Sequence, residues 1–553
     1  MVDTSAAEFP AETPYFYSAY DRDNEAEPLT GRKMVVLGSG PIRIGQGIEF
    51  DAASVYALEA LKARGYRAIM INSNPETVST DFNASDRLYF EPLTLEDVLN
   101  IVDLEKPEGV LVQFGGQTAI NLAEGLAAHG VPIVGTGLDG LMQAEDRHRF
   151  DDLLEAEHLR RPPGLTATTT NEALQAAEKL GFPVLVRPSF VLGGRAMRII
   201  DDEEALRQYL VTNQEIGEDR PLLLDRYMSG IELEVDAVSD GKRVIIPAVM
   251  EHVERAGVHS GDSVAVLPPV RASQRVIDEV VRITEILCRS LQVKGLLNIQ
   301  FVVVDDTVYV IEANPRSSRT VPFLIKATHL PLVDLAIEAA VAGRLPATVK
   351  DGLQPMPDYY AVKMPVFSFS KLGQVDAALG PEMKSTGEVM GIDQDLPRAL
   401  YRALVGGGFR LSRGGRILAT IADADKEEAL PMLRALADMG YRLFATSGTW
   451  AMLSSHGVAA TPVYRLGERR PHLVDLIRDG QFELVINTIT RGGQREREGF
   501  LIRRTTVERG ILCMTSLDTV AAAIDALKGR SQRPFEVHSL NEWRKGETHG
   551  ARV

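Results

Sequence analysis

The chain has 553 residues, of which 45% are hydrophobic and 25% charged, and its formal net charge is −16. This length predicts several domains, the composition is that of a globular protein, and the acidity argues against a general nucleic-acid binder. Its two cysteines exclude a disulfide framework, and no apolar run approaches the roughly 18 residues of a membrane span, so we expect a cytoplasmic protein without a membrane partner.

Residues 1–32 are polar and contain several aromatic residues and prolines. They read either as an arm or linker that packs on another part of the protein, or as a flexible tail. From residue 33 to residue 145, buried strand-like runs alternate with amphipathic helical runs. This alternation predicts a Rossmann-like α/β domain with a parallel sheet.

The glycine-rich loop from Gly38 to Gly45 resembles a dinucleotide-binding fingerprint. The third glycine comes two positions late, and the second strand ends in Asn72 where an acidic residue would hold a ribose. We therefore prefer a glycine turn that closes a βα unit, although Arg43 and Gln46 leave room for an anion or an interdomain contact.

Residues 146–345 mix strands and helices in a different order. A charged helix is predicted over residues 144–160, followed by two strands joined by a loop with Gly193, Gly194 and Arg195 at its tip. Such a loop either closes over phosphate groups, with Arg187 nearby, or is an ordinary hairpin. Glu232 and Glu234 fall on one face of a later strand.

A polar loop then lies between strong strands and contains His252, His259 and Asp262. Loops of this kind are often functional, although His259 alone would be an ordinary surface histidine. A long amphipathic helix over residues 272–292 follows and leads into the next hairpin.

The stretch from Leu297 to Arg319 contains two strand-like runs around an acidic turn. A hairpin loop of three residues centred on Asp306 would place Gln300 opposite Glu312 and Asn298 opposite Asn314. Since Glu312 and Asn314 are two residues apart, they share a face. Amide and carboxylate oxygens ahead of Arg316 and Arg319 suit a divalent cation that bridges phosphate oxygens, with the arginines holding an anion.

Residues 346–408 read as a connecting segment, and residues 409–545 as a third α/β domain. Thr446, Ser447, Gly448 and Thr449 open a helix there. They form either a phosphate-binding site at the helix N-terminus or an ordinary threonine N-cap. Asn487 and Thr488 end a strand, where ligands of parallel sheets collect.

Several strings extend these observations to a family resemblance: PVLVRPSFVLGGRAM, MEHVERAGVHSGDS, LNIQFVV, IEANPRSSRTVPF, NPETVSTD and GPEMKSTGEVMG. They closely resemble the C-terminal half of the large chain of carbamoyl-phosphate synthase. The resemblance covers essentially the whole chain, and residues 6–20 (AAEFPAETPYFYSAY) look like the end of the helical oligomerisation region that precedes this half. It implies an α/β multidomain protein with a pre-ATP-grasp domain, an ATP-grasp domain and a methylglyoxal-synthase-like allosteric domain.

The resemblance implies phosphorylation of carbamate by ATP. Its cofactors would be two Mg²⁺ or Mn²⁺ ions, with K⁺ as an optional further ion. Metal ligands would be Gln300, Glu312 and Asn314. Arg316 and Arg319 would hold the acceptor anion and act with Asn314 in catalysis. The positions that match nucleotide contacts are Arg147, Arg187, Met228, Glu232, Gly257, Val258, His259 and Ser260. Arg226 departs from the family, which often has histidine there, so the detail of adenine recognition stays open.

The last domain resembles a sensor of nucleoside monophosphates. Its effector positions are Lys426, Thr446, Thr449, Arg465, Asn487 and Thr488. Arg465 replaces a lysine and Ile489 a threonine, which leaves the effector (UMP, IMP or another nucleotide) open. His252, Glu254 and Asp262 match positions that contact an ornithine activator in some members. Met364 stands where a carboxylate would hold the amine, so ornithine activation is not expected.

The expected function is therefore that of the C-terminal part of a glutamine-dependent synthase that feeds arginine and pyrimidine biosynthesis. Its expected partners are the N-terminal half of the large chain and a small glutamine amidotransferase chain. Whether the chain is one half of a split gene or a truncation stays open. Two alternatives are a catalytically silent nucleotide-sensing subunit and another ATP-grasp ligase. The metal-type residues argue against the first, and NPETVSTD with the effector domain argues against the second.

Overall fold

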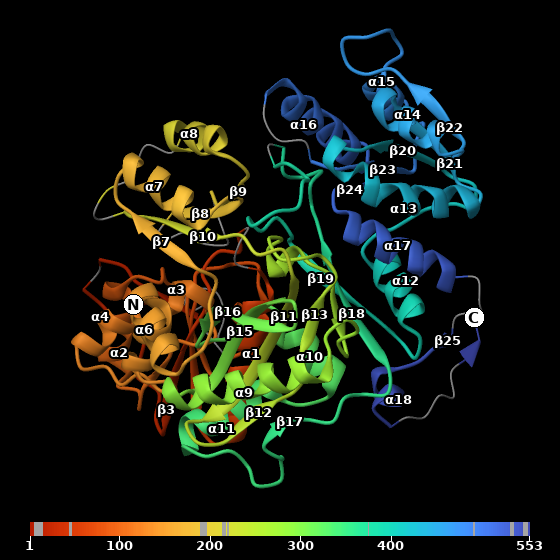
Figure 1. Cartoon of the computed structure of the whole chain (residues 1–553). Helices are drawn as coiled ribbons and strands as arrows, with labels where there is room; N and C mark the ends of the chain where they lie inside the picture. Colours follow the sequence, from red (N-terminus) through yellow and green to blue (C-terminus); the bar gives the residue numbers. More distant parts are fainter. Residues whose placement is uncertain are drawn as a thin grey trace. The chain divides into compact units, whose positions relative to one another are not determined.

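The computed structural model describes residues 1–4, 15–20, 22–43, 47–188, 196–212, 217, 220–373, 375–489, 493–530, 536–545 and 551–552. Figure 1 shows the helices and strands along the chain. They belong to two compact units, each of which is described by itself. Unit 1 comprises Met1–Pro162, Glu232–Glu251 and Pro268–Pro357, and unit 2 comprises Pro163–Ile231, His252–Leu267 and Asp358–Val553.

Unit 1 contains a six-stranded sheet in the order β1-β2-β5-β4-β3-β6, in which all neighbours except β1 and β2 are parallel. The strands are β1 Val2–Asp3, β2 Tyr15–Tyr17, β3 Lys33–Leu37, β4 Arg67–Ile71, β5 Arg87–Tyr89 and β6 Val110–Leu111. The predicted parallel sheet is confirmed, with β5 as a strand that was not predicted. Strand β2 joins the edge of the sheet, and Phe16 packs on Tyr89 with 3% of its surface exposed. The packed-arm interpretation is therefore confirmed for residues 15–17.

Six helices accompany this sheet: α1 Glu49–Ala63, α2 Leu95–Glu105, α3 Gly116–Ile120, α4 Ala123–Ala128, α5 Leu138–Glu145 and α6 Arg147–Ala156. The single helix predicted over residues 144–160 is wrong, because the chain turns at Asp146. The Asp146 side chain accepts a hydrogen bond from the Arg149 amide and caps α6. A short polar side chain at this position satisfies an otherwise unpaired N–H and starts a new helix.

The glycine turn after β3 packs against Asn72. The Asn72 side chain accepts a hydrogen bond from the Gly40 amide at 2.9 Å, and a Cβ on Gly38 would overlap Asn72. Asn72 therefore closes the turn, in agreement with the preferred interpretation. Gly45 and Gln46 lie outside the described residues.

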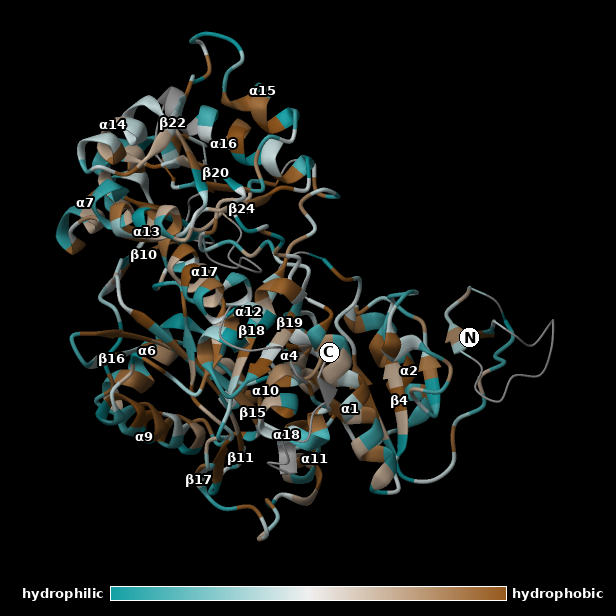
Figure 2. Ribbon diagram, turned by 90° about the vertical axis from the view of Figure 1, so that its right-hand side faces the viewer, coloured by the Kyte–Doolittle hydropathy of each residue, from teal (hydrophilic) through white to brown (hydrophobic). Residues whose placement is uncertain are grey.

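Unit 1 also contains strands in the order β16-β15-β11-β13, in which β15 and β16, and β11 and β13, are antiparallel pairs. Strand β12 lies between β11, to which it is antiparallel, and β17, to which it is parallel. These are β11 Ile231–Asp240, β12 Val244–Ile246, β13 Met250–His252, β15 Lys294–Val304, β16 Thr307–Asn314 and β17 Gly352–Leu353. Its helices are α9 Gln274–Ser290, α10 Val321–Thr328 and α11 Leu332–Ala342. Figure 2 shows hydrophobic and hydrophilic residues alternating along α9, which buries Val276, Val280, Ile283 and Leu287. These buried residues form one apolar stripe along α9, and the helix packs against the rest of the unit through this stripe.

Unit 2 begins with an antiparallel sheet in the order β7-β10-β8-β9. The elements are β7 Gly164–Ala167, α7 Thr170–Leu180, β8 Val184–Pro188, β9 Arg198–Ile200, α8 Glu203–Thr212 and β10 Leu222–Arg226. The two strands predicted around the glycine loop are confirmed, whereas Gly193, Gly194 and Arg195 lie outside the described residues. Residues 346–408 contain more structure than a connection needs. Their strands β18 Tyr360–Val366 and β19 Gly387–Asp393 pair with each other, β18 also pairs with β14 Ala265–Leu267, and α12 Leu396–Gly406 follows.

The C-terminal part of unit 2 is a five-stranded parallel sheet in the order β22-β21-β20-β23-β24. Its strands are β20 Arg416–Thr420, β21 Arg442–Thr446, β22 Ala460–Val463, β23 Leu484–Asn487 and β24 Leu512–Met514. Its helices are α13 Lys426–Asp438, α14 Ser447–Ser455, α15 Leu473–Arg478, α16 Gly493–Glu508, α17 Leu517–Gly529 and α18 Leu540–Lys545. A short pair, β25 Glu536–Val537 and β26 Ala551–Arg552, ends the chain.

Successive residues of β20 face opposite sides of this sheet. Ile417 packs in a core with residues of α13 and α17, whereas Leu418 packs with residues of α15 and α16. The sheet is thus covered on both faces, as parallel sheets require. Within the described residues, every helix is too short or too polar to cross a lipid bilayer.

Candidate functional site

The hairpin of β15 and β16 has the register that the sequence predicts at its functional end. Asn298 lies opposite Asn314, and Gln300 lies opposite Glu312. The predicted three-residue loop is wrong, because Val304 pairs with Thr307 around a turn of two residues. Asp305 and Asp306 both have positive φ, as a tight hairpin turn of this hand requires. A bulge after Gln300 absorbs the one-residue difference and keeps the predicted pairs opposite each other.

Hydrogen bonds orient the side chains on this face. Asn314 donates through Nδ2 to Glu312 Oε1 at 3.0 Å and accepts at Oδ1 from Arg316 Nη2 at 3.1 Å. Gln300, Glu312 and Asn314 are all half-buried. They offer one carboxylate and two amide oxygens, and no group of three or more His, Cys, Asp and Glu side chains suited to a metal occurs among the described residues. One carboxylate with neutral oxygen donors is the kind of set that Mg²⁺ uses when phosphates supply further ligands.

The loop after β16 is held by the first sheet of the same unit. Gln113, which follows β6, donates through Nε2 to Pro315 O at 2.7 Å, and its carbonyl accepts from the Ser317 amide at 2.8 Å. The Arg316 guanidinium lies 5.7 Å from the Phe50 ring centroid, and Arg316 Nε is buried without a hydrogen-bond partner. A buried N–H without an acceptor is costly, and an anionic ligand would satisfy it. Sequence reasoning missed Gln113, because only the fold brings it to this loop.

Next to the hairpin, on the neighbouring strand β11, lies a buried acidic group. Glu232, Glu234 and Asp236 are 4%, 2% and 0% exposed. Their spacing of two places them on one face of the strand, as predicted for the first two. Burial, together with the nearby Glu234 carboxylate, raises the pKa of Asp236 to about 7. Arg147 lies elsewhere in unit 1, at the start of α6, and pairs with Asp151 at 3.1 Å.

The remaining predicted nucleotide-binding residues belong to unit 2. Gly257 has a φ of 105°, and a Cβ there would lie 2.9 Å from the Tyr227 ring, so this position suits glycine. The Tyr227 hydroxyl donates to Ala256 O at 2.7 Å and holds the loop close. The buried Lys363 ammonium donates to Ser260 O at 3.0 Å, and the His259 amide donates to Gly380 O at 2.8 Å.

Other members of the set lie on neighbouring segments of this unit. Arg187, at the end of β8, lies 3.6 Å from Asp225, and Met228 follows β10. Val258 stands between Gly257 and His259 in the same loop. The loop 256–260 is therefore fixed from both sides by residues outside the predicted set.

Of the three positions that resemble ornithine contacts, Glu254 and Asp262 accept hydrogen bonds from groups of the same unit. Glu254 accepts from Thr519 Oγ1 at 2.6 Å and from the Val264 amide at 2.8 Å. Burial raises the pKa of Glu254, although these hydrogen bonds act in the opposite direction. Asp262 accepts from the Lys384 and Ser385 amides, and His252 is fully buried.

The predicted effector residues gather at the carboxyl edge of the C-terminal sheet. Asn487 ends β23, Thr446 ends β21, Lys426 follows β20, and Arg465 follows β22. The Lys426 ammonium lies beside Gly448, 3.1 Å from where a Cβ would be. Thr446 is the N-terminal cap residue of α14 but makes no side-chain capping bond, so the plain N-cap interpretation is not supported.

Several of these effector residues are already hydrogen-bonded. Thr449 accepts from the Ile421 amide, and Thr488 accepts from the Ala422 amide. Arg465 forms an ion pair of 2.6 Å with Glu498. Asn487 donates to Thr420 Oγ1 and accepts from Arg503. The edge is thus built of cationic, hydroxyl and amide groups, which is the chemistry of a phosphate-binding site.

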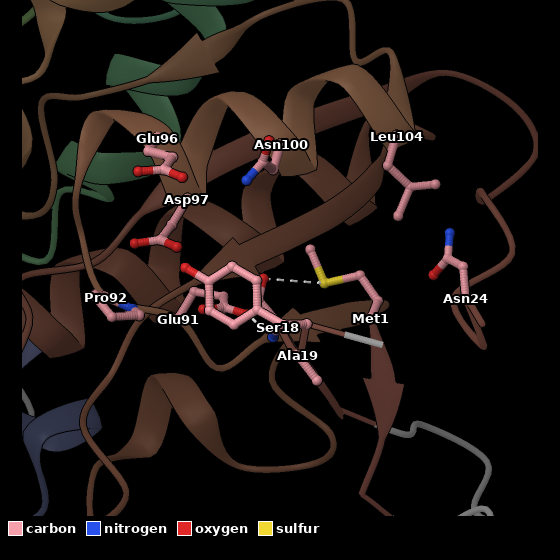
Figure 3. Close-up of a pocket in the computed structure, with 11 residues that line it drawn as sticks. Met1, Ser18, Ala19, Asn24, Glu91, Pro92, Glu96, Asp97, Asn100 and Leu104 are labelled. Carbon is pink, nitrogen blue, oxygen red and sulfur yellow. Dashed lines mark hydrogen bonds between the residues drawn. The ribbon is translucent and has the colours of Figure 1, made fainter. Parts of the chain in front are cut away.

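A hollow of about 490 Å³ lies away from all of these residues (Figure 3). It lies between the N-terminal arm and α2, and its walls include Glu91, Glu96 and Asp97. These side chains would repel phosphate groups at neutral pH, and none of the predicted site residues lines it. We therefore do not assign the nucleotide to this hollow.

Family models match most of the chain in order. Residues 30–143 match the carbamoyl phosphate synthase preATP-grasp domain, and residues 146–348 match the ATP binding domain of the carbamoyl-phosphate synthase L chain. These two matches cover more than half of the 553 residues. The chain belongs to the carbamoyl-phosphate synthase large-chain family. Residues 428–515 match the MGS-like domain, which confirms the predicted fold class.

Solved structures share the ATP-grasp fold with this family member. Biotin carboxylase from Campylobacter jejuni, a β,γ-ATP complex, is 14% identical, with 68% of this chain and 91% of that chain covered and a TM-score of 0.53. The biotin carboxylase domain of 2-oxoglutarate carboxylase from Hydrogenobacter thermophilus, with MgADP and bicarbonate, is 16% identical, with 68% and 89% covered and a TM-score of 0.53. N5-carboxyaminoimidazole ribonucleotide synthetase from Thermus thermophilus is 16% identical, with 67% and 96% covered and a TM-score of 0.51. At these identities the likeness shows the fold alone.

Proposed function

We propose that the chain transfers the γ-phosphoryl group of ATP to carbamate and forms carbamoyl phosphate and ADP. The observation that carries this proposal is the end of the β15–β16 hairpin. Gln300, Glu312 and Asn314 share one face there, and Arg316 follows with its buried Nε lacking an acceptor. Oxygen donors next to a guanidinium suit a metal-bound phosphate beside a small carboxylate-like anion.

In this reaction an oxygen of carbamate attacks the γ-phosphorus while the bond to the β-phosphate oxygen breaks and ADP leaves. Arg316 and Arg319 would hold the carbamate in line with that bond, and their positive charge would stabilise the transferring group. Gln300, Glu312 and Asn314 would hold Mg²⁺, which when bound neutralises charge on the phosphate oxygens. Carbamate is already an anion, so the chain needs no general base for this step.

The proposal assigns nucleotide contacts to Arg147, Arg187, Met228, Glu232 and residues 257–260. The fixed backbone of the 256–260 loop supports this assignment, since a preformed loop costs less entropy when it binds. We also propose that Mn²⁺ can replace Mg²⁺ and that K⁺ is an optional further ion. Both ideas rest on the family resemblance.

The reverse reaction tests the catalytic proposal without any partner. Purified chain is mixed with carbamoyl phosphate and MgADP, and ATP formation is followed by a coupled luciferase assay. Wild type should form ATP, and Glu312→Gln should lower the rate at least about 100-fold, because it removes the carboxylate of the proposed metal site, and losing even a group that only orients a metal ligand costs about 10- to 100-fold. Asp305→Asn is the matched control. It makes the same chemical change at the exposed turn of the same hairpin, where asparagine tolerates the positive φ.

A silent nucleotide-sensing subunit is the competing function. It would bind ADP, as measured by calorimetry, but form no ATP from carbamoyl phosphate. A different ATP-grasp ligase would likewise form no ATP from carbamoyl phosphate. These outcomes separate the competing functions from the proposal.

We further propose that glutamine-dependent synthesis needs two partners, the N-terminal half of the large chain and a small amidotransferase chain, acting together in the cytoplasm. Glutamine, bicarbonate and MgATP should yield carbamoyl phosphate only when all three are present. Synthesis by this chain alone would contradict this assignment of partners.

We propose a nucleoside monophosphate as the effector at Lys426, Thr446, Thr449, Arg465, Asn487 and Thr488. UMP or IMP should raise the midpoint of thermal unfolding, and Lys426→Met should remove this shift because it removes a cation beside α14. Unchanged shifts in the variant would contradict this site.

A further inference from the structure

Asn298 lies on β15, on the same face as the predicted metal ligands and between Asn314 of β16 and the acidic residues of β11. It lies opposite Asn314 across the β15–β16 pair and is 2% exposed. Its Nδ2 donates to Glu234 Oε1 at 2.8 Å and to Asp236 Oδ1 at 3.2 Å, so both amide hydrogens point toward β11. Its Oδ1 faces the other way and accepts from Asn314 Nδ2 at 3.4 Å. One side chain therefore connects two buried carboxyl groups to a predicted metal ligand.

The direction of these hydrogen bonds follows from the chemistry of the groups. An ionised carboxylate only accepts hydrogen bonds, whereas an amide presents a donor at one end and an acceptor at the other. Glu234 Oε1 and Asp236 Oδ1 both accept from Asn298 Nδ2, so the donor end of Asn298 is turned toward β11. Its acceptor end must then face Asn314, and this draws the amino group of Asn314 inward.

Asn314 consequently directs its oxygen outward. Its Nδ2 is taken by Asn298 and by Glu312, while its Oδ1 faces Arg316. Only the oxygen of an amide can bind Mg²⁺, so a flipped Asn314 would place a donor N–H against the cation. The orientation of the Asn314 amide thus depends on Glu234 and Asp236, which are connected to it through Asn298.

Asp236 is itself fixed from the opposite side. Thr320, which follows the Arg316–Arg319 loop, donates to Asp236 Oδ2 at 2.6 Å, and Ser318 Oγ lies 2.8 Å from Thr320 Oγ1. Burial and the like charge of Glu234 raise the pKa of Asp236 to about 7. The ionised carboxylate of Asp236 therefore destabilises the folded protein. Asp236 and Thr320 are 0% and 3% exposed. A fully buried acidic pair contributes little stability by itself, so a role in orienting Asn298 gives a reason for its presence.

We propose that Glu234 and Asp236 are positioning residues that act through Asn298 to keep the amide oxygen of Asn314 directed at the metal ion. This rests on the proposed function, because that function assigns Asn314 to the metal. The acidic pair touches neither substrate nor metal in this scheme. Its effect is on metal affinity, and its loss should leave the binding of metal-free ADP intact.

The experiment compares Mn²⁺ binding and ADP binding in the full chain. Mn²⁺ affinity in the presence of saturating ADP is measured by electron paramagnetic resonance, and metal-free ADP affinity by calorimetry in EDTA. The main variant is the double replacement Glu234→Gln, Asp236→Asn, which keeps the shape of both side chains but lets Asn298 face either way. The second variant, Asn298→Ala, removes the connecting amide. Asp305→Asn serves as the control.

The double variant and Asn298→Ala should each weaken Mn²⁺ binding by about 10- to 100-fold, the usual effect of losing a group that orients a metal ligand. ADP affinity without metal should change less than about twofold. A variant that combines Glu234→Gln, Asp236→Asn and Asn298→Ala should bind Mn²⁺ no worse than Asn298→Ala alone, because both changes break the same connection.

Three outcomes would overturn the proposal. If wild type binds Mn²⁺ with ADP and the folded variants bind it equally well, the positioning role is wrong while the proposed function stands. If Asn298→Ala does not fold, unchanged Mn²⁺ affinity in the shape-conserving double variant refutes the role in the same way. If wild type binds no Mn²⁺ with ADP, both the positioning role and the proposed function are wrong.

Discussion

Arg503 in α16 forms an ion pair with Asp376, and the energetics of this pair can be predicted from its contacts. The guanidinium donates from Nε and Nη2 to the two oxygens of Asp376, each at 2.6 Å, and from Nη1 to Asn487 Oδ1 at 2.8 Å. The Arg503 side chain is 3% exposed, whereas that of Asp376 is 30% exposed. The two partners therefore differ in how easily water can replace the lost contact.

This difference predicts an asymmetry between two substitutions. Asp376→Ala leaves a buried guanidinium with one amide partner and should lower the free energy of unfolding by about 3–5 kcal/mol. Arg503→Met leaves a carboxylate that water reaches, fills most of the vacated volume, and should cost only about 1–3 kcal/mol. The order of the two effects is the testable point, because it follows from exposure and not from the strength of the contact.

Urea unfolding followed by tryptophan fluorescence measures both values. The chain has two tryptophans, and Trp450 lies in α14 of the same domain. A Trp543→Phe background makes the signal specific to that domain. Asp525→Ala, at an ion pair with both side chains 56% exposed, is the control and should change stability by less than about 0.5 kcal/mol. An Arg503→Met variant that is less stable than Asp376→Ala would refute the reasoning.

Three further predictions concern pH, thiol reactivity and packing. Burial raises the pKa of Asp376, but Arg503, the Ala378 amide and Lys384 together lower it more, so the net pKa lies below the ordinary value of 3.8. Its contribution to stability is therefore present above pH 3.8 and lost as pH falls through the folded-state pKa, so the difference between wild type and Asp376→Ala should shrink in acid unfolding experiments. Cys288 is fully buried in α9 and burial raises its pKa far above 9, so it should react with a thiol reagent only after unfolding, and rapid labelling of native protein at this position by mass spectrometry would contradict its burial. Gly391→Ala would press a methyl group into the backbone of α12 at Ala399 and Ala403 and should lower the thermal midpoint by several degrees, whereas Gly387→Ala on the same strand meets open space and should not, as calorimetry can show.

The sequence predicts the functional end of the β15–β16 hairpin but not its turn. Strand parity and the pairing of Gln300 with Glu312 are local properties, because side chains alternate strictly along a strand. The turn size differs because Asp305 and Asp306 both adopt positive φ, and a compensating bulge restores the register. Alternation alone cannot locate such a bulge.

Elements that depend on distant partners were not predictable in the same way. Strand β5 has three residues and is stabilised by parallel pairing with β4 and β2. Strands β18 and β19 fall in a proline- and glycine-rich stretch, where composition favours a connection. Gln113 and Asp236 reach the site only through contacts with residues far away in the chain, Pro315 and Thr320. Their sequence neighbourhoods are those of ordinary strand residues.

The proposed effector site was predictable in part. The position of Asn487 and Thr488 at a strand end follows from the parallel sheet, and the structure places Lys426, Thr446 and Arg465 at the same edge. The pairing of Arg465 with Glu498 could not be predicted, because α16, which carries Glu498, was not recognised in the sequence.

The central claim is that this chain phosphorylates carbamate, and the reverse reaction tests it most directly. Carbamoyl phosphate and MgADP should give ATP with the wild-type chain and with Asp305→Asn, and at least about 100 times more slowly with Glu312→Gln. ATP formation that is undiminished in Glu312→Gln, or its absence from wild type that binds ADP and Mg²⁺, would contradict the claim.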